Sequence, residues 1–410
     1  MQFSRNQLII FGVVGFIFIF LLLGFFDIIP VFKTAGPRVD LTFWGVENEN
    51  SFDSLIKRYQ SLYPNVSIEY IRFDSQDYER ELVNALAAGE GPDIFMFRSD
   101  WLMEHSLKLT PHLEDQMDVF KLRNLFPQVV EENFVLDNKI YALPLSIDTL
   151  ALYYNRDIFD RRGVVSPPKT WSRFRDIVFD NKISAGFGGT SSTVPQAPDI
   201  ISLLMLQSEV KMVSDDLKSA VFGLNRQALD ALNFYIQFTS PNESSLDAFS
   251  AGRLGMMIDY PAAKQYIKNK NPHLDFEVAL VPQFNLDKPV SFASYYGLAV
   301  SRAIERSETR KREALNFVLF LTTNEEMAEH YALVSNRPPA LRSLIERYID
   351  HPEYGVFAKQ ALTARSWPQV DKEKVFSIFD DMIRLSRTKE FGPRRALEKA
   401  ASEITSLMNR

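Results

Sequence analysis

Three aspartates, Asp93, Asp148 and Asp259, lie beside short apolar runs that the sequence predicts to be β-strands. Asp148 follows the apparent strand 139–143 and precedes the apolar run 150–154. Because ligands bind at strand ends in open α/β sheets, these carboxylates are candidates for ligand contact. Two carboxylates can also cleave a glycosidic bond, whereas a loop aspartate can simply cap its own turn. The spacing leaves all three interpretations open.

Little in the sequence supports a metal site, a nucleotide site or thiol chemistry. The five histidines never pair at a spacing of three or four residues, and neither an HExxH motif nor an acidic calcium loop is present. The glycine-rich stretch 186–190 lacks the lysine of a P-loop and the spacing of a dinucleotide fingerprint. The chain contains no cysteine, which excludes disulfides and thiol nucleophiles. We therefore expect no catalytic residue, no metal site and no cofactor.

The bulk composition is that of a globular protein. The chain has 410 residues, of which 46% are hydrophobic and 24% charged. This length is too great for one ordinary core and indicates two or three domains. The net charge of −6 argues against a nucleic-acid partner, which would favour a basic surface.

Apolar periodicity places the candidate residues on an alternating α/β framework. Strand and helix patterns alternate near the start of the chain, which is typical of a parallel sheet covered by helices. The expected strands are 39–44, 66–73, 94–97, 139–143, 150–154, 254–258, 276–280 and 294–300. The expected helices include 52–63, 78–88, 199–207, 226–238, 308–321, 324–334, 373–385 and 393–408.

The N-terminal region predicts a membrane anchor. Leu8 to Phe26 is a run of 19 uncharged residues, about 29 Å long as a helix, which is close to the thickness of a bilayer core. Arg5 before it favours an orientation with the N-terminus inside. A cleaved signal peptide is the alternative, but Lys33 stands where the best cleavage site needs a small residue. We expect an uncleaved, single-pass anchor in the cell membrane, with the body on the extracytoplasmic side.

Several stretches together resemble one family. They are LTFWG (41–45), ALAAGEGPDIFMFRSDWL (85–102), KIYALPLSIDTLALYYNRDIF (139–159), PPKTWSRF (167–174), AFSAGRLGMMIDYP (248–261) and YGLAV (296–300). In this order they resemble the extracellular solute-binding proteins of ABC importers, in the sugar-binding group related to maltose-binding protein. The resemblance covers nearly all of residues 39–408.

The resemblance implies a two-lobe, periplasmic-binding-protein-like α/β fold with a hinged ligand cleft, preceded here by one N-terminal transmembrane helix. The implied division is an anchor and linker at 1–38, a first lobe at 39–147 plus 298–342, and a second lobe at 148–297 plus 343–410. The chain would act as a monomer that captures a small solute and delivers it to the permease subunits of an ABC transporter.

The resemblance also implies a set of ligand contacts, at strand ends of both lobes and at the crossover between them. These residues are Trp44, Glu47, Phe97, Asp100, Asp148, Thr190, Ser191, Ser192 and Tyr260. The expected solute is a sugar or oligosaccharide, because aromatic rings pack on sugar rings and carboxylates accept hydrogen bonds from hydroxyls. A binder of a peptide or polyamine is one alternative, and a glycoside hydrolase is another.

Overall fold

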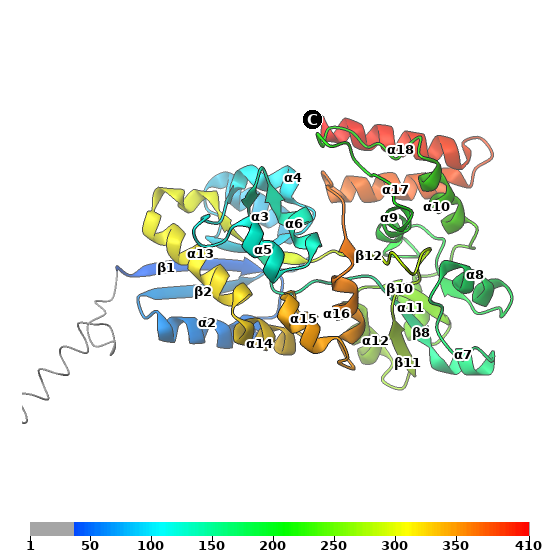
Figure 1. Ribbon diagram of the computed structural model, residues 1–410, viewed down its shortest axis with the longest axis horizontal. Helices are drawn as coiled ribbons and strands as arrows, with labels where there is room; N and C mark the ends of the chain where they lie inside the picture. The colour runs from blue at the N-terminus through cyan, green and yellow to red at the C-terminus, as the bar shows by residue number, and fades with distance from the viewer. Residues whose placement is uncertain (1–36, 410) are drawn as a thin grey trace, which may run out of the picture.

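A six-stranded sheet forms the centre of the first lobe, on the left of Figure 1. The structure is a computed structural model that describes residues 37–409. In β1 the side chains of Val39, Leu41 and Phe43 alternate into the core, as the sequence pattern predicts. The strand order is β2-β1-β3-β13-β4, with β7 also paired to β13. The bounds are β1 (Val39–Gly45), β2 (Val66–Arg72), β3 (Ile94–Arg98), β4 (Leu109–Thr110), β7 (Ala142–Pro144) and β13 (Tyr296–Ser301).

The direction of the strands confirms the α/β interpretation of residues 39–98. β1 runs parallel to β2 and β3, and helices connect these strands. β13 returns to this sheet from far along the chain and runs antiparallel to β3, with Ala299 opposite Phe95. The carboxyl ends of β1 and β3 therefore lie at one edge of the sheet, where Glu47 and Asp100 follow them.

Helices cover both faces of this sheet. Phe43 of β1 packs its ring against Phe52 of α2 at 4.8 Å and against Phe317 of α13 at 6.2 Å. Phe134 of α6 packs closely on Gly297 of β13, where a Cβ atom would lie only 2.8 Å from the phenyl ring. The helices are α2 (Asn50–Leu62), α3 (Tyr78–Ala88), α4 (Leu102–His105), η1 (Ser106–Lys108), α5 (Val119–Leu125), α6 (Gln128–Phe134), η2 (Arg302–Arg306), α13 (Glu308–Thr323) and α14 (Glu325–Ser335). A hairpin of β5 (Val135–Leu136) and β6 (Lys139–Ile140) follows α6.

The second lobe has its own sheet and its own apolar core. The strand order is β11-β8-β10-β9, and β8 is antiparallel to both β10 and β11. Trp171 is fully buried at the start of α8 and donates its indole N–H to Gln207 at 2.6 Å. The strands are β8 (Ala151–Asn155), β9 (Ala185–Gly186), β10 (Met256–Asp259) and β11 (Phe276–Ala279). The helices are α7 (Arg156–Arg161), α8 (Trp171–Phe179), α9 (Ala197–Gln207), α10 (Arg226–Ile236), α11 (Ser245–Ser250), α12 (Ala262–Lys270), α17 (Lys372–Ser386) and α18 (Gly392–Met408).

Three stretches of chain join the lobes through the narrow middle of Figure 1. Isolated β-bridges link Ser146 to Pro339 and Thr149 to Ala293. The short strands β12 (Ser291–Phe292) and β14 (Ala364–Arg365) pair in parallel beside them. The crossovers are thus few and short, which is the construction of a hinge.

Apolar contacts favour a later position for the third crossover than the one expected from the sequence. The prediction assigned 343–410 to the second lobe, but Leu344, Ile345 and Tyr348 of α15 (Arg342–Tyr348) are buried in the core of the first lobe. Ala358 and Ala361 of α16 (Gly355–Ala361) join the same core, whereas Phe357 of this helix packs in an apolar cluster of the second lobe. We therefore propose a first lobe of 39–147 plus 293–364 and a second lobe of 148–292 plus 365–409.

The expected anchor, Leu8 to Phe26, lies outside the described residues. Among residues 37–409, no helix is both long enough and apolar enough to cross a membrane.

Candidate functional site: a layer of polar side chains between the lobes

Arg337 joins two of the predicted site residues at the hinge. Its guanidinium lies 2.7 Å from the carboxylate of Glu47, which follows β1, and it also pairs with Asp148 on the first crossover. Burial raises the pKa of both carboxyl groups, and the positive charge of Arg337 opposes that effect. Oδ1 of Asp148 is buried and has no hydrogen-bond partner among the described residues. That oxygen is therefore an acceptor available to a ligand hydroxyl.

A second cluster surrounds Asp100 at the end of β3. Arg98 donates to Oδ1 of Asp100 at 2.7 Å, and Nζ of Lys372 lies 3.0 Å from Oδ2. Burial alone would raise the pKa of Asp100, but Arg98 and Lys372 outweigh burial and lower the pKa to about 2. Nη2 of Arg98 is buried without a hydrogen-bond partner in the described chain. Because Lys372 begins α17 of the second lobe, this ion pair connects the two lobes.

The second lobe adds a tyrosine and a carboxylate to this layer. The hydroxyl of Tyr260, directly after β10, donates to Asp199 of α9 at 2.8 Å. Burial raises the pKa of Asp199, whereas the positive charge of Lys372 lowers it. Tyr260, Asp199 and Lys372 therefore face the Asp100 cluster from the opposite lobe.

Asp259 lies just behind this layer. It is 5% exposed and accepts hydrogen bonds from the backbone N–H of Tyr260 at 2.8 Å and from the side chain of Gln196 at 3.1 Å. Burial raises the pKa of Asp259 to about 7. Both donors are neutral, and no cation is among the described contacts of this carboxyl group. Ionisation of Asp259 near neutral pH is therefore costly.

The predicted triplet Thr190, Ser191 and Ser192 lies further along α17. Ser191 donates its backbone N–H to Asp380 at 2.8 Å and also pairs with it through its hydroxyl. Thr190 and Ser192 share a hydrogen bond of 2.9 Å between their hydroxyls. Asp380 is eight residues beyond Lys372 on the same helix, which places it about 12 Å away. The triplet is therefore anchored away from the Asp100 cluster.

The other two predicted aromatic contacts, Trp44 and Phe97, occupy different surroundings from Tyr260 and from each other. Trp44 is half-buried and packs against Phe73, with ring centroids 4.4 Å apart. Phe97 is 1% exposed, and its ring contacts Trp101 and Phe134 within the first core. Phe97 therefore supports the strand end rather than presenting a face to the cleft, and we leave it out of the proposed site.

Asp93 is separated from the other two aspartates. It precedes β3, whereas Asp100 follows that strand, so the two lie at opposite ends, roughly 20 Å apart. Its carboxylate accepts from the backbone N–H of Thr42 at 2.7 Å and from Arg310 at 2.8 Å. Asp93 therefore fixes α13 to the sheet, and the hydrolase alternative loses one of its three candidate carboxylates.

Four residues of the layer are absent from the sequence-based set. They are Arg98, Asp199, Arg337 and Lys372. Arg98 lies inside the segment that carries Asp100, so the strand-end argument could have included it. Lys372 is 272 positions from its partner Asp100 (372 − 100), and no local pattern signals that contact.

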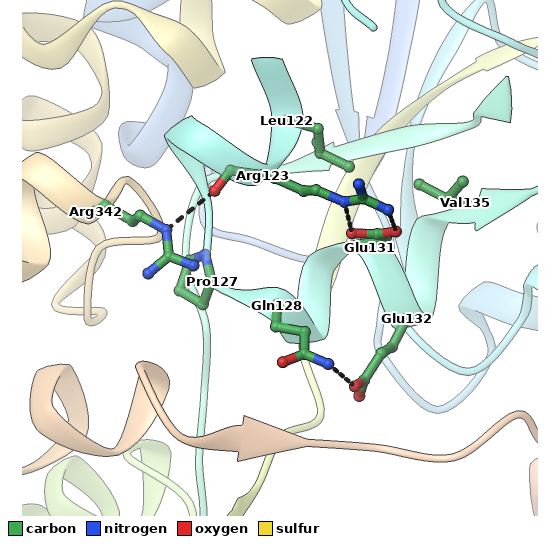
Figure 2. A pocket seen from close by; sticks show the side chains of 8 residues that line it. All are labelled: Leu122, Arg123, Pro127, Gln128, Glu131, Glu132, Val135 and Arg342. Carbon is green, nitrogen blue, oxygen red and sulfur yellow. Dashed lines mark hydrogen bonds and ion pairs between the residues drawn. The ribbon is translucent and has the colours of Figure 1, made fainter. Parts of the chain in front are cut away.

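Two cavities differ in their relation to the polar layer: one lies on the first lobe alone, and the other lies between the lobes beside Asp100. A cavity of about 630 Å³ lies on the first lobe between α5, α6 and Arg342, and Figure 2 shows Arg123 turned toward Glu131 and Gln128 turned toward Glu132. Arg123 pairs with Glu131 at 2.6 Å, and none of the predicted site residues lines this cavity. Beside Asp100, a cavity of about 50 Å³ extends to Pro368 and Gln369 of the second lobe, which leaves room for about one or two water molecules. The lobes are thus closed on each other at Asp100.

These features define a class of protein: two α/β lobes, a short hinge, and buried polar groups from both lobes meeting between them. The profile of the family described as bacterial extracellular solute-binding protein matches residues 54–355. The chain belongs to this family of binding proteins, and its body is extracytoplasmic.

Individual relatives are distant. A chain of Brucella abortus (strain 2308) that is named only as a binding protein is 23% identical over 396 residues, which cover 91% of this chain and 93% of that one. The maltotriose-binding protein of Pyrococcus abyssi is 26% identical over 306 residues, 72% of this chain and 64% of the relative. The crystal structure of the cyclic alpha-maltosyl-1,6-maltose binding protein of Arthrobacter globiformis has a TM-score of 0.78 at 17% identity, covering 90% of this chain and 99% of that one. The last comparison confirms the two-lobe fold.

Proposed function

We propose that this protein is the membrane-tethered, substrate-binding subunit of an ABC importer and that its solute is a sugar or oligosaccharide. The observation that carries the proposal is the polar layer, in which Asp100, Asp148 and Tyr260 come from the first lobe, the crossover and the second lobe. The names of the Pyrococcus and Arthrobacter proteins support a saccharide.

The mechanism follows from the arrangement of the lobes. A solute enters when the hinge opens, and its hydroxyls donate to carboxylates such as Oδ1 of Asp148. Unpaired donors such as Nη2 of Arg98 supply complementary hydrogen bonds to the hydroxyl oxygens. Closure excludes water and strengthens these bonds, and the closed form docks on the permease. No step of this cycle requires a catalytic residue.

Asp148→Asn tests the contact at the hinge. The amide keeps the size of the side chain but removes the charge that strengthens hydrogen bonds to hydroxyls, so we expect affinity to fall about tenfold to a hundredfold. Calorimetric titration should follow a thermal-shift screen of maltotriose and other saccharides, with a peptide and a polyamine included. The screen therefore also tests the alternative solutes.

Asp160→Asn is the matched control, because Asp160 is exposed on α7 and undergoes the same change of charge. Its affinity should equal that of the wild type. An unchanged affinity in Asp148→Asn, combined with a lower melting temperature, would show that Asp148 only stabilises the hinge through Arg337. Release of reducing sugar from an oligosaccharide would instead favour the hydrolase.

A further inference from the structure

A cluster of metal-ligating side chains lies outside the interlobe layer, where α3 meets α4. Glu79 in the first turn of α3 and Glu104 and His105 in α4 each direct one ligand atom to a common point, and these atoms all lie within 4.8 Å of one another. Residues far apart on two helices thus converge. No sequence pattern indicates this cluster, because only Glu104 and His105 are adjacent in the chain.

The histidine supplies an independent indication of a ligand. His105 is 6% exposed, and its Nε2 is buried without a hydrogen-bond partner among the described residues. Nε2 lies 3.6 Å from the carboxylate of Glu79 and 4.0 Å from that of Glu104, which is too far for a hydrogen bond. A buried ring nitrogen close to two carboxylates but bonded to neither leaves room for a bridging water or an ion.

We propose that Glu79, Glu104 and His105 bind a Zn²⁺ ion. One imidazole nitrogen and two carboxylates are a donor set that zinc accepts, with water as the fourth ligand, and the nitrogen disfavours Ca²⁺ and Mg²⁺. Tetrahedral ligands of zinc lie about 3.4 Å apart, so the carboxylates must move by roughly 1 Å. Both glutamates can do so, because their side chains are 33% and 38% exposed.

Lys108 competes with the ion. Its Nζ lies 3.2 Å from Nδ1 of His105, and donation to that atom keeps the ring proton on Nε2. Zinc needs the lone pair of Nε2, so the proton must move to Nδ1 and the ammonium group must turn away. The side chain of Lys108 is partly exposed and free to turn toward solvent. Removal of this lysine should therefore strengthen binding.

Titration of tag-free, full-length protein in detergent with ZnCl₂, followed by calorimetry, tests the site. Glu79→Gln and Glu104→Gln should each weaken zinc binding at least about tenfold, because each removes one of three protein ligands. Lys108→Met should tighten it about threefold or more. Glu81→Gln is the matched control, since Glu81 is an exposed residue of α3 outside the cluster, and it should leave the affinity unchanged.

X-ray absorption at the zinc edge should show nitrogen and oxygen neighbours at about 2.0–2.2 Å, including one imidazole. The proposal is overturned if wild-type protein fails to bind zinc at millimolar concentration. It is also overturned if Glu104→Gln binds zinc as well as Glu81→Gln does, because the ion would then lie elsewhere on the chain.

Discussion

Asp259 is the residue whose burial has the clearest consequence for stability. Its pKa is raised to about 7 in the folded chain, against about 3.9 when unfolded. The folded state therefore holds a proton that the unfolded state releases, so the stability due to Asp259 is complete below about pH 4 and is lost as pH rises to about 7. Asp259→Asn removes this dependence while keeping an acceptor for Tyr260 and Gln196. We expect it to unfold like the wild type near pH 4 and to be more stable at pH 8, by up to about 4 kcal/mol.

Urea unfolding of both proteins at pH 4 and pH 8 measures this difference. Asp160→Asn is a suitable control, because that exposed side chain should change the free energy of unfolding little at either pH. If Asp259→Asn is less stable than the wild type at pH 8, the carboxyl group of Asp259 ionises in the folded chain without a cost in free energy. That result would contradict its raised pKa.

At the residue scale, the sequence interpretation named acidic groups of the layer but not their cationic partners. The strand-end argument and the resemblance placed Glu47, Asp100 and Asp148 in the candidate site, and the structure brings each into a buried ion pair. The cations could not be assigned in the same way. Arg337 is 189 positions from Asp148. Only the folded chain therefore shows that Arg337, in the loop after α14, neutralises the carboxylate of Asp148 at the hinge. Phe97 differs from these acidic residues, because its strand-end side chain lies in the apolar core.

At the scale of elements, α17 holds the second lobe against the first through Lys372. The ammonium group lies 3.0 Å from Asp100 and 3.3 Å from the hydroxyl of Ser294. Lys372→Met keeps the aliphatic chain and removes these contacts, leaving Asp100 with Arg98 as its only described cationic partner. We expect the free energy of unfolding to fall by about 1–3 kcal/mol, the usual effect of losing a hydrogen bond to a charged group. Chemical denaturation of full-length protein measures the loss.

Lys374→Met provides the comparison within the same helix turn. Lys374 is 57% exposed and pairs with Asp371, so its replacement should change stability by less than about 1 kcal/mol. Equal stability of the two variants would contradict the assignment of Lys372 as the interlobe contact.

The elements themselves were predicted unevenly, and length explains why. The expected helix 78–88 coincides with α3, and 393–408 differs from α18 by one residue. The sequence interpretation omitted α4, α5, α6, α7, α11, α12, α15 and α16, none longer than nine residues. A helix of about two turns contains too few apolar repeats to establish a period of 3.6 residues. The omission of α15 and α16 also left the chain around the expected third crossover without assigned elements.

At the scale of the whole molecule, we propose that Leu8 to Phe26 remains in the mature protein as its anchor. The run is uncharged, and Lys33 occupies the position where a cleavage site needs a small residue. Full-length chain should therefore stay with membranes after an alkaline wash, and detergent should release it. Intact mass of this material should include the first residues, and a mature N-terminus beyond Ala35 would refute the anchor.

Opening of the hinge is required for the proposed cycle. The cavity beside Asp100 measures about 50 Å³, whereas sites for small solutes are typically about 300–1,000 Å³. We therefore expect a saccharide to reach Asp100 only when the lobes separate. Because the chain has no cysteine, Arg58→Cys on α2 and Asp230→Cys on α10 would place one fluorescent label on each lobe.

We expect a saturating sugar identified in the thermal-shift screen to increase energy transfer between these labels, because bound solute favours the closed form. Without solute, the labelled Lys372→Met variant should show less transfer than the labelled wild type, since it lacks the ion pair with Asp100 that favours closure. At saturation the two proteins should converge, because solute then supplies the contacts that hold the lobes together. The labelled Lys374→Met variant should follow the wild type throughout. Identical transfer in all three proteins, with and without bound sugar, would mean that the lobes do not move and that solute enters by another route.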